Sequence, residues 1–312
     1  MINTIKALCH PFQTIADIVN APSSIAASLL RRNLFEQKAN YLSEKALHSV
    51  EKGVSTNKLC DSEVIVSLTS YDRRVNDVYL AIESIMQGSI LPNRIILWLS
   101  ECEFKSKVLP ITLQNQQKRG LDIRFCKDIK SYKKLVYTLN EFPNACVITI
   151  DDDLIYNFDL VENLIASHTS NPKCIWANRI HEIRFDNNKK IKSYLQWKMR
   201  SKSDAKNKKD NFFTSGGGTL FPPHSLHDEV FNENTFMDIC PTADDIWFNA
   251  MARLKGTEIC KSFTHSPVGD DFLINESLQS ESLETINNNP INCQNDIQLK
   301  AVFEKYGIMQ YK

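Results

Sequence analysis

The sequence predicts an α/β fold in which a mostly parallel central sheet is flanked by helices. Two patterns lead to this prediction. From Cys60 onward, short β-rich apolar segments alternate with amphipathic segments of helical length, as in right-handed βαβ units. Before that point, from Thr4 to about Lys52, apolar residues recur at helical spacing. We therefore expect an N-terminal helical extension over residues 1–60 and one α/β domain over residues 61–312.

The extension should form two or three helices outside the main fold, interrupted at Pro22. Two interpretations of these helices are open. They pack as an ordinary helical addition, or the apolar stripe beside Arg31 and Arg32 makes peripheral contact with a membrane or a partner protein.

The domain should begin with four buried strands and the helices between them. The strands are expected at EVIVSLTS (63–70), RIILWLS (94–100), LDIRFC (121–126) and ACVITI (145–150). The helices are expected at 76–87, in a segment ending at Lys118, and from Ser131, as the capping residue, to about Phe142. In such sheets, ligands bind beyond the carboxyl ends of the strands.

After Asn178 the pattern is less regular. We expect a hairpin, then a solvated mobile loop in the basic segment 201–210, a helix at 244–254, a short strand near 257–262 and a C-terminal helix at 296–306.

Composition excludes several classes of protein. The 37 basic and 37 acidic residues cancel, which argues against nucleic acid as the main partner. The nine cysteines show neither a CxxC pair nor zinc-type spacing, so we expect reduced thiols in a cytoplasmic protein. No apolar run approaches the roughly 20 residues of a membrane span, and no secretory signal is evident.

The segment VITIDDDLIY (147–156) places three carboxylates directly after a predicted strand. In extended backbone Asp151 and Asp153 face the same side, while Asp152 points away. Such a D-x-D pair suits a hard divalent cation that also holds phosphate oxygens. The structural alternative is a turn in which the aspartates cap backbone amides.

Two other classes of protein also place acids at a strand end. A nucleoside triphosphatase would need a G-x-x-x-x-G-K-[ST] loop, which the sequence lacks. A haloacid-dehalogenase-like phosphatase would use Asp151 as nucleophile and Asp153 as acid/base. Its motif usually follows the first strand and has Thr or Val where this chain has Ile155.

Two further motifs follow. In TSGGGTLFPP, three of the nine glycines are consecutive, which suggests unusual backbone angles or a close approach of backbone to ligand. In PTADDIWFNAMARLKG, Thr242 and Asp245 resemble a capping box at a helix start. A carboxylate held there is also well placed to act as a general base.

In this order, the three motifs resemble nucleotide-sugar-dependent glycosyltransferases of the GT-A fold, which has a Rossmann-like sheet. The nearest likeness is to bacterial enzymes that build surface polysaccharides such as lipopolysaccharide and capsule. The resemblance covers Val64 to Tyr306. It implies a hexosyltransferase that moves a sugar from a nucleotide-diphospho-sugar, with a UDP-sugar as the expected donor, to a hydroxyl of a glycan or lipid-linked glycan.

The resemblance also implies roles for individual residues. Mn²⁺ or Mg²⁺ would be held by Asp153, assisted by Asp151 and by His265. Asp245, or else Asp244, would be the catalytic base of an inverting displacement. The donor would be bound by Thr69, Ser70, Tyr71, Arg73, Asp128, Lys134, Asp151, Asp152, Gly216, Gly217 and Gly218.

The chain departs from the family in two ways. Inverting members usually have Glu-Asp where this chain has Asp244-Asp245, which leaves the identity of the base open. The Q-x-x-R-W signature of processive synthases is absent, so one sugar per encounter is expected. A nucleotide-sugar-binding protein that has lost turnover is the non-enzymatic alternative.

Overall fold

Four parallel strands form the part of the sheet that carries the site. A computed structural model describes residues 25–263, 272–281, 287–288 and 292–308 of the chain. The four strands are β1 (Val64–Thr69), β2 (Arg94–Ser100), β3 (Leu121–Cys126) and β4 (Cys146–Ile150), and all four confirm predicted strands. Strand β1 pairs in parallel with both β2 and β4, and β2 pairs in parallel with β3.

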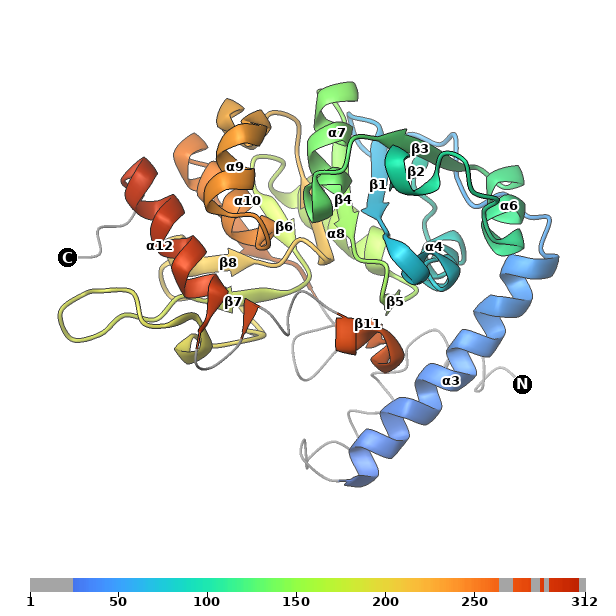
Figure 1. Cartoon of the computed structure of the whole chain (residues 1–312), viewed down its shortest axis with the longest axis horizontal. Helices are drawn as coiled ribbons and strands as arrows, with labels where there is room; N and C mark the ends of the chain where they lie inside the picture. The colour runs from blue at the N-terminus through green and yellow to red at the C-terminus, as the bar shows by residue number, and fades with distance from the viewer. Residues whose placement is uncertain (1–24, 264–271, 282–286, 289–291, 309–312) are drawn as a thin grey trace.

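Three further strands complete a seven-stranded sheet in the order β10-β6-β9-β4-β1-β2-β3 (Figure 1). β9 (Gly217–Phe221) is antiparallel to both β4 and β6 (Ile175–Ala177), and β10 (Ile259–Lys261) is parallel to β6. The sequence predicted β10 but neither β6 nor β9. Strand β6 is short, and β9 begins in the glycine run, where strand propensity is low. The α/β class and the mostly parallel sheet are confirmed.

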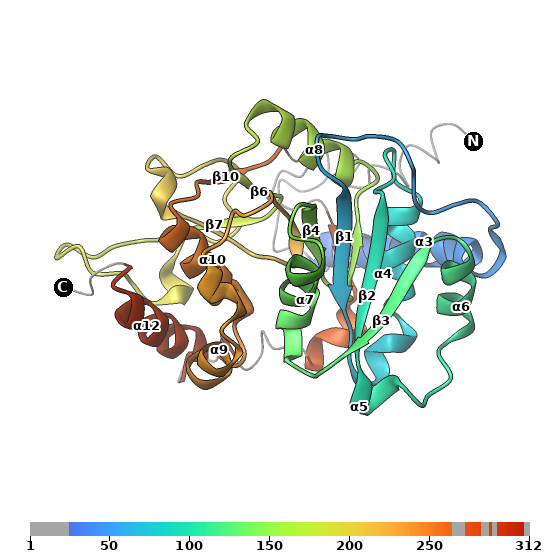
Figure 2. The ribbon, with the colours of Figure 1, turned by 90° about the horizontal axis from the view of Figure 1, so that it is seen from above.

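Helices cover both faces of the sheet (Figure 2). Helices α7 (Lys133–Glu141), α10 (Asp244–Lys255) and α12 (Gln294–Tyr306) share one apolar core with the face that carries Ile65. Helices α4 (Tyr79–Met86), α6 (Ile111–Lys118) and α8 (Leu160–Ser170) pack on the opposite face, which carries Val64 and Val66. Alternate residues of β1 thus enter different cores, as expected for a parallel sheet buried on both sides.

Shorter elements connect this framework. They include two small antiparallel pairs, β5 (Leu154–Tyr156) with β11 (Phe272–Ile274) and β7 (Ile180–Glu182) with β8 (Asn211–Phe213). Helix α5 (Glu101–Phe104) directly follows β2, and helix α9 (Glu233–Ile239) directly precedes α10. The lysines of the basic segment 201–210 are exposed, as expected, but the segment is anchored to the sheet, because Asp204 accepts a hydrogen bond from the amide of Lys261 on β10 and Ser201 is buried.

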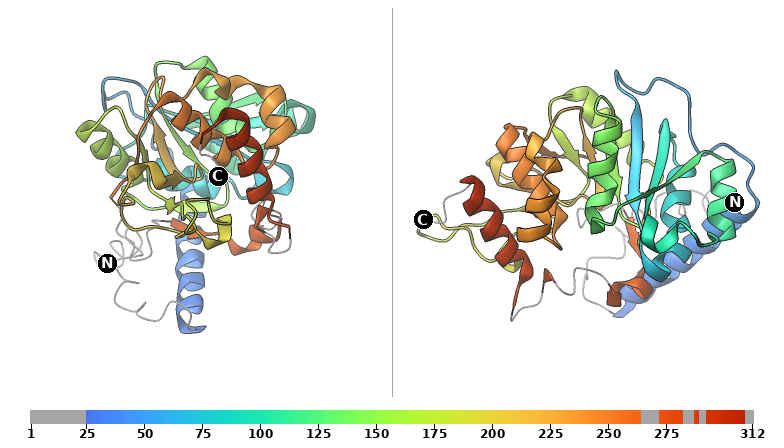
Figure 3. Two further views of the ribbon diagram at one scale, coloured as in Figure 1. Left: turned by 90° about the vertical axis from the view of Figure 1, so that its left-hand side faces the viewer. Right: turned by 45° about the horizontal axis from the view of Figure 1, so that its top comes forward.

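The extension is represented by one helix, α3 (Ile25–His48), whose N-terminal end projects from the molecule (Figures 1 and 3). The helix is not outside the fold, since Leu42 packs in a cluster with Leu80, Ile155 and Leu273, and side chains of its first half, including Leu34, pack against this cluster. Helices expected before Ile25 lie outside the described residues. None of the described helices combines the length and the apolar character needed to cross a membrane.

Candidate active site

A pocket of about 650 Å³ opens where β1 and β4 end, the position at which parallel α/β sheets bind ligands. It brings together the segment after β1, the three aspartates after β4 and the start of α10. Predicted site residues that line it are Thr69, Ser70, Tyr71, Asp128, Lys134, Asp151, Asp152, Asp153, Asp244 and Asp245. His265 lies outside the described residues.

The three aspartates do not follow strand alternation. Asp152 does not point away from the site: it accepts a hydrogen bond of 2.6 Å from Ser70 Oγ and shares Arg74 with Asp153. The reason is that β4 ends at Ile150 and the chain turns before β5, so the two-residue repeat does not extend through the motif. Burial raises the pKa of Asp152 to about 6, although Arg74 opposes this shift.

Arg74 is the cation that holds these two acids. Its Nη2 atom lies 2.5 Å from Asp152 Oδ1 and 2.9 Å from Asp153 Oδ2. Arg73, which the resemblance implies as a donor-binding residue, does not line this pocket: it is exposed and lines a separate cleft beside Val108. The sequence did contain a signal for the burial of Arg74. Arg74, Val78 and Ile82 recur every four residues, as on one face of a helix, and all three are buried.

Lys134 joins the two acidic motifs. Its Nζ atom lies 2.7 Å from Asp151 Oδ1 and 3.2 Å from Asp244 Oδ2. Burial disfavours its charge, but Asp151 and Asp244 together raise the pKa of Lys134 above its usual range. Asp128 is paired with the preceding residue, Lys133, and not with Lys134.

The first turn of α7 thus carries two buried lysines, Lys133 and Lys134. Cations are unfavourable at a helix N-terminus, where the macrodipole is positive. The carboxylates that face them offset this cost, so the placement is understandable only together with the pocket. Ser131 does not cap the helix: the residue at that position is Tyr132, without a side-chain cap bond, and a short 3-10 turn, Lys130–Tyr132, precedes it.

Asp245 is bound to the segment before the glycine run. Its Oδ1 atom accepts hydrogen bonds from the amide of Ser215 at 2.7 Å and from Ser215 Oγ at 2.6 Å. Burial, followed by the neighbouring charge of Asp244, raises the pKa of Asp245 to about 6. The predicted capping box is absent, because Thr242 Oγ1 bonds to Asn287 and Gln298 instead.

The glycine run is not a wall of the pocket. All three glycines are buried, and none lines it. A Cβ atom on Gly216 would lie 1.6 Å from Asp151 Oδ2, and Gly218 has a φ of +90°. The run therefore allows β9 to pass directly behind Asp151. Tyr156 completes the arrangement: its hydroxyl accepts from the amide of Asp151 and donates to the carbonyl of Gly216.

Gly216→Ala should displace the Asp151 carboxylate and destabilise the fold by about 1–3 kcal/mol, as overpacking does. Urea unfolding measures the stability, and calorimetry with a nucleoside diphosphate measures binding. Gly256→Ala is the control, since its φ of +81° also disfavours a side chain but no atom lies within 4 Å of the added Cβ. Equal binding by the two variants would contradict the role given to Gly216.

Two further polar residues of the pocket were not predicted. Arg179 donates from Nε to Thr214 Oγ1 at 2.6 Å and packs beside Gly217. His181 accepts from the amide of Arg200, and burial together with Arg179 lowers the pKa of His181 to about 3, so this ring is neutral. Both follow β6 in segments whose sequence shows no regular pattern.

The donor set of the pocket agrees with a hard divalent cation, because carboxylate oxygens are the ligands that Mg²⁺ and Mn²⁺ prefer. The acids are nevertheless held by Lys134 and Arg74 rather than gathered around one point. Among the described residues, two groups of three could chelate a metal ion, and neither includes these aspartates. A cation here would therefore need oxygens from a bound ligand as well.

No protein-family model matches the chain, and no curated protein matches it. Similar solved structures include S. aureus TarS 1–349, with 9% identity and a TM-score of 0.46 over 78% of this chain and 72% of that one. Another is CMP:2-keto-3-deoxy-manno-octonic acid synthetase complexed with CTP, with 10% identity and a TM-score of 0.42 over 74% of this chain and 100% of that one. Similarity this low assigns no function.

Proposed function

We propose that this chain is a GT-A-type glycosyltransferase that moves a sugar from a nucleotide-diphospho-sugar to a hydroxyl of a glycan or glycolipid. A role in the synthesis of bacterial surface polysaccharides is part of the proposal, and it rests on the resemblance of the three sequence motifs alone. The observation that supports it most is the bridge made by Lys134. This residue joins Asp151 after β4 to Asp244 at the start of α10, so the two acidic motifs meet in one pocket.

The donor is expected to bind across the carboxyl ends of β1 and β4. The hydroxyl of Ser70 is already bonded to Asp152, and that of Thr69 to the carbonyl of Trp98. Tyr71, with 37% of its surface exposed, is therefore the residue after β1 that offers a ring face to a nucleobase. The diphosphate would lie near Lys134 and Arg179, whose charges attract it.

Asp153, with Asp151, would hold Mn²⁺ or Mg²⁺ against the diphosphate. When bound, the ion neutralises charge on the departing nucleoside diphosphate. Asp245 would take the proton from the acceptor hydroxyl as that oxygen attacks C1 of the sugar. A pKa near 6 suits a base that works close to neutral pH. Asp244 is less suitable, since its Oδ2 atom already pairs with Lys134.

A donor screen tests the proposal directly. The chain is incubated with individual nucleotide sugars, Mn²⁺ and candidate acceptors, and released nucleoside diphosphate and the anomeric configuration of the product are measured. Inversion relative to the donor is expected. Release of inorganic phosphate from simple phosphoesters would instead favour the phosphatase alternative, and binding of donor without turnover would favour the non-catalytic one.

Asp153→Ala should abolish the Mn²⁺-dependent increase in nucleoside-diphosphate affinity, because Asp151, which is also paired with Lys134, cannot hold the ion alone. Calorimetry with and without Mn²⁺ measures this increase. Asp122→Ala is the control, since that carboxylate pairs with Arg124 on β3 away from the pocket. If Asp153→Ala and the wild type show the same response to Mn²⁺, Asp153 is not the metal ligand.

A further inference from the structure

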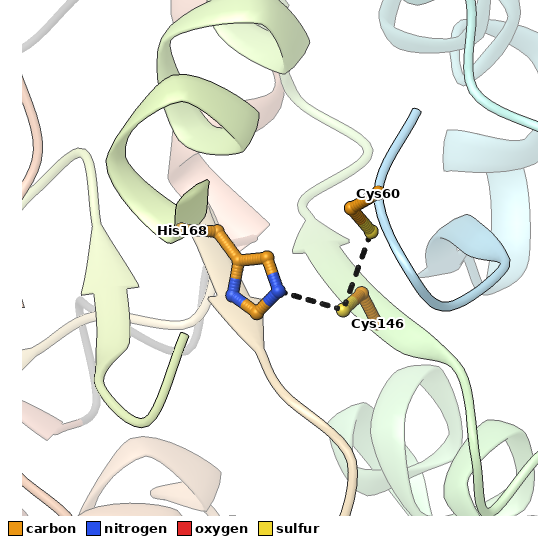
Figure 4. Close-up of side chains that lie close together, drawn as sticks. All are labelled: Cys60, Cys146 and His168. Carbon is orange, nitrogen blue, oxygen red and sulfur yellow. Dashed lines mark hydrogen bonds between the residues drawn. The ribbon is translucent and has the colours of Figure 1, made fainter. Parts of the chain in front are cut away.

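Two thiols and an imidazole meet at the opposite end of β4 from the pocket (Figure 4). Cys60 lies in the segment between α3 and β1, Cys146 is the first residue of β4, and His168 is in the last turn of α8. The Sγ atoms of the two cysteines are 3.9 Å apart, and Cys146 Sγ is 3.5 Å from His168 Nε2. We call these three residues the Cys–Cys–His cluster.

These separations match a tetrahedral metal site. With a Zn–S bond of about 2.3 Å and a Zn–N bond of about 2.0–2.1 Å, tetrahedral angles place two sulfur ligands about 3.8 Å apart and a sulfur and a nitrogen about 3.6 Å apart. The three ligand atoms all lie within 4.8 Å of one another. The cluster therefore needs movements of only tenths of an ångström along the two measured edges to surround an ion.

The surroundings of the cluster also favour a cation. Cys146 is fully buried and His168 is 7% exposed, while Cys60 is only partly buried and leaves a path for entry. Cys60 Sγ donates a hydrogen bond of 3.2 Å to the carbonyl oxygen of Ser62, and a fourth ligand, protein oxygen or water, would complete the coordination. Nε2 of His168 faces Cys146 Sγ, and among the described residues Nδ1 of this ring has no hydrogen-bond partner.

The second group of potential ligands in the described residues provides a contrast. Cys174, Glu258 and Cys260 also lie close together, but Lys208 Nζ is 3.3 Å from Cys260 Sγ. An ammonium group at that position repels a metal ion and already neutralises the ligands. No ion pair or hydrogen bond between a lysine or arginine and the Cys–Cys–His cluster is found in the described part of the chain.

We propose that Cys60, Cys146 and His168 bind Zn²⁺ in a structural site. Two soft thiolates and one imidazole are a ligand set that zinc prefers, and each thiol would release its proton to solvent on binding. The ion would connect the segment that follows α3 to the central strand β4 and to α8. This site lies beyond the proposed transferase chemistry, and either could be absent without the other.

Elemental analysis tests the site on the full chain, purified under reducing conditions, loaded with Zn²⁺ and then desalted. Equimolar zinc is expected in the wild type and in the control Cys174→Ser, and loss of zinc is expected in Cys60→Ser and Cys146→Ser. Cys60→Ser should fold, because the side chain is only partly buried. As a second measurement, Zn²⁺ should raise the thermal midpoint of the wild type but not that of Cys60→Ser.

Co²⁺ added in place of Zn²⁺ should give a thiolate-to-metal charge-transfer band that Cys60→Ser abolishes and Cys174→Ser retains. Substoichiometric zinc in the reduced wild type would overturn the proposal. Loss of zinc in Cys174→Ser instead of Cys60→Ser would also overturn it, as it would assign the metal to the other group. So would a Cys60–Cys146 cross-link, found by mass spectrometry, that forms equally with and without Zn²⁺.

Discussion

Asp245→Asn should lower turnover by roughly 10²–10⁴ while leaving the fold and donor affinity nearly unchanged. The amide oxygen of asparagine can still accept both hydrogen bonds from Ser215, so the connection between α10 and the segment before β9 is kept. What is lost is the group that receives the proton of the acceptor hydroxyl. Single-turnover rates with saturating donor and acceptor measure this loss, and calorimetry measures donor affinity.

The pH profile adds a second test. Because the pKa of Asp245 is raised to about 6, its carboxylate takes up a proton as the pH falls through that value, and wild-type turnover should fall with it. Asp244→Asn is the matched control and should keep an acidic limb, moved to lower pH because the charge of Asp244 helps to raise the pKa of Asp245. A larger loss of turnover in Asp244→Asn than in Asp245→Asn would transfer the role of base to Asp244. A retained anomeric configuration would remove the need for a base.

Lys134→Met should destabilise the fold strongly. It leaves Asp151 and Asp244 without the buried cation that both contact. Breaking a fully buried pair costs about 3–5 kcal/mol, and we expect a value on the order of 2–3 kcal/mol here because Asp151 is partly exposed to the pocket. Urea unfolding of variant and wild type at neutral pH measures the difference.

The sign of the pH dependence follows from the same contacts. Burial opposes the charge of Asp151, but Lys134 lowers the pKa of Asp151 overall, so its contribution to stability is present at neutral pH and is lost as the pH falls through the folded-state pKa. The difference in unfolding free energy between the wild type and Lys134→Met should therefore become smaller as the pH falls. The double variant Lys134→Met/Asp244→Asn should recover part of the stability. A deficit that stays constant as the pH falls from neutral to below 3.8, the ordinary pKa of an aspartate, with no recovery in the double variant, would attribute the loss to packing.

The sequence by itself determined the α/β class, the four parallel strands and the position of the acidic segment after the fourth of them. These features rest on local information: β-rich apolar runs, helical spacing between them, and the rule that parallel sheets bind ligands at their carboxyl ends. Strand β9 was missed for a local reason as well. Its glycines disfavour a strand in isolation, and only the close approach of Asp151 explains them.

Only the tertiary structure decided which side chains share a charge. Lys134 meets Asp151 and Asp244, although 17 residues separate it from the first and 110 from the second, and no periodicity links positions so far apart. Arg74 is buried at the pocket while Arg73 is exposed, and the 3-10 turn that carries both residues decides this difference. The Cys–Cys–His cluster joins residues 60, 146 and 168, whose spacing resembles no zinc motif. The physical reason is common to all three. The partners that surround a buried charge or metal ligand in space determine whether it is stable there, whereas the sequence shows only which residues are neighbours along the chain.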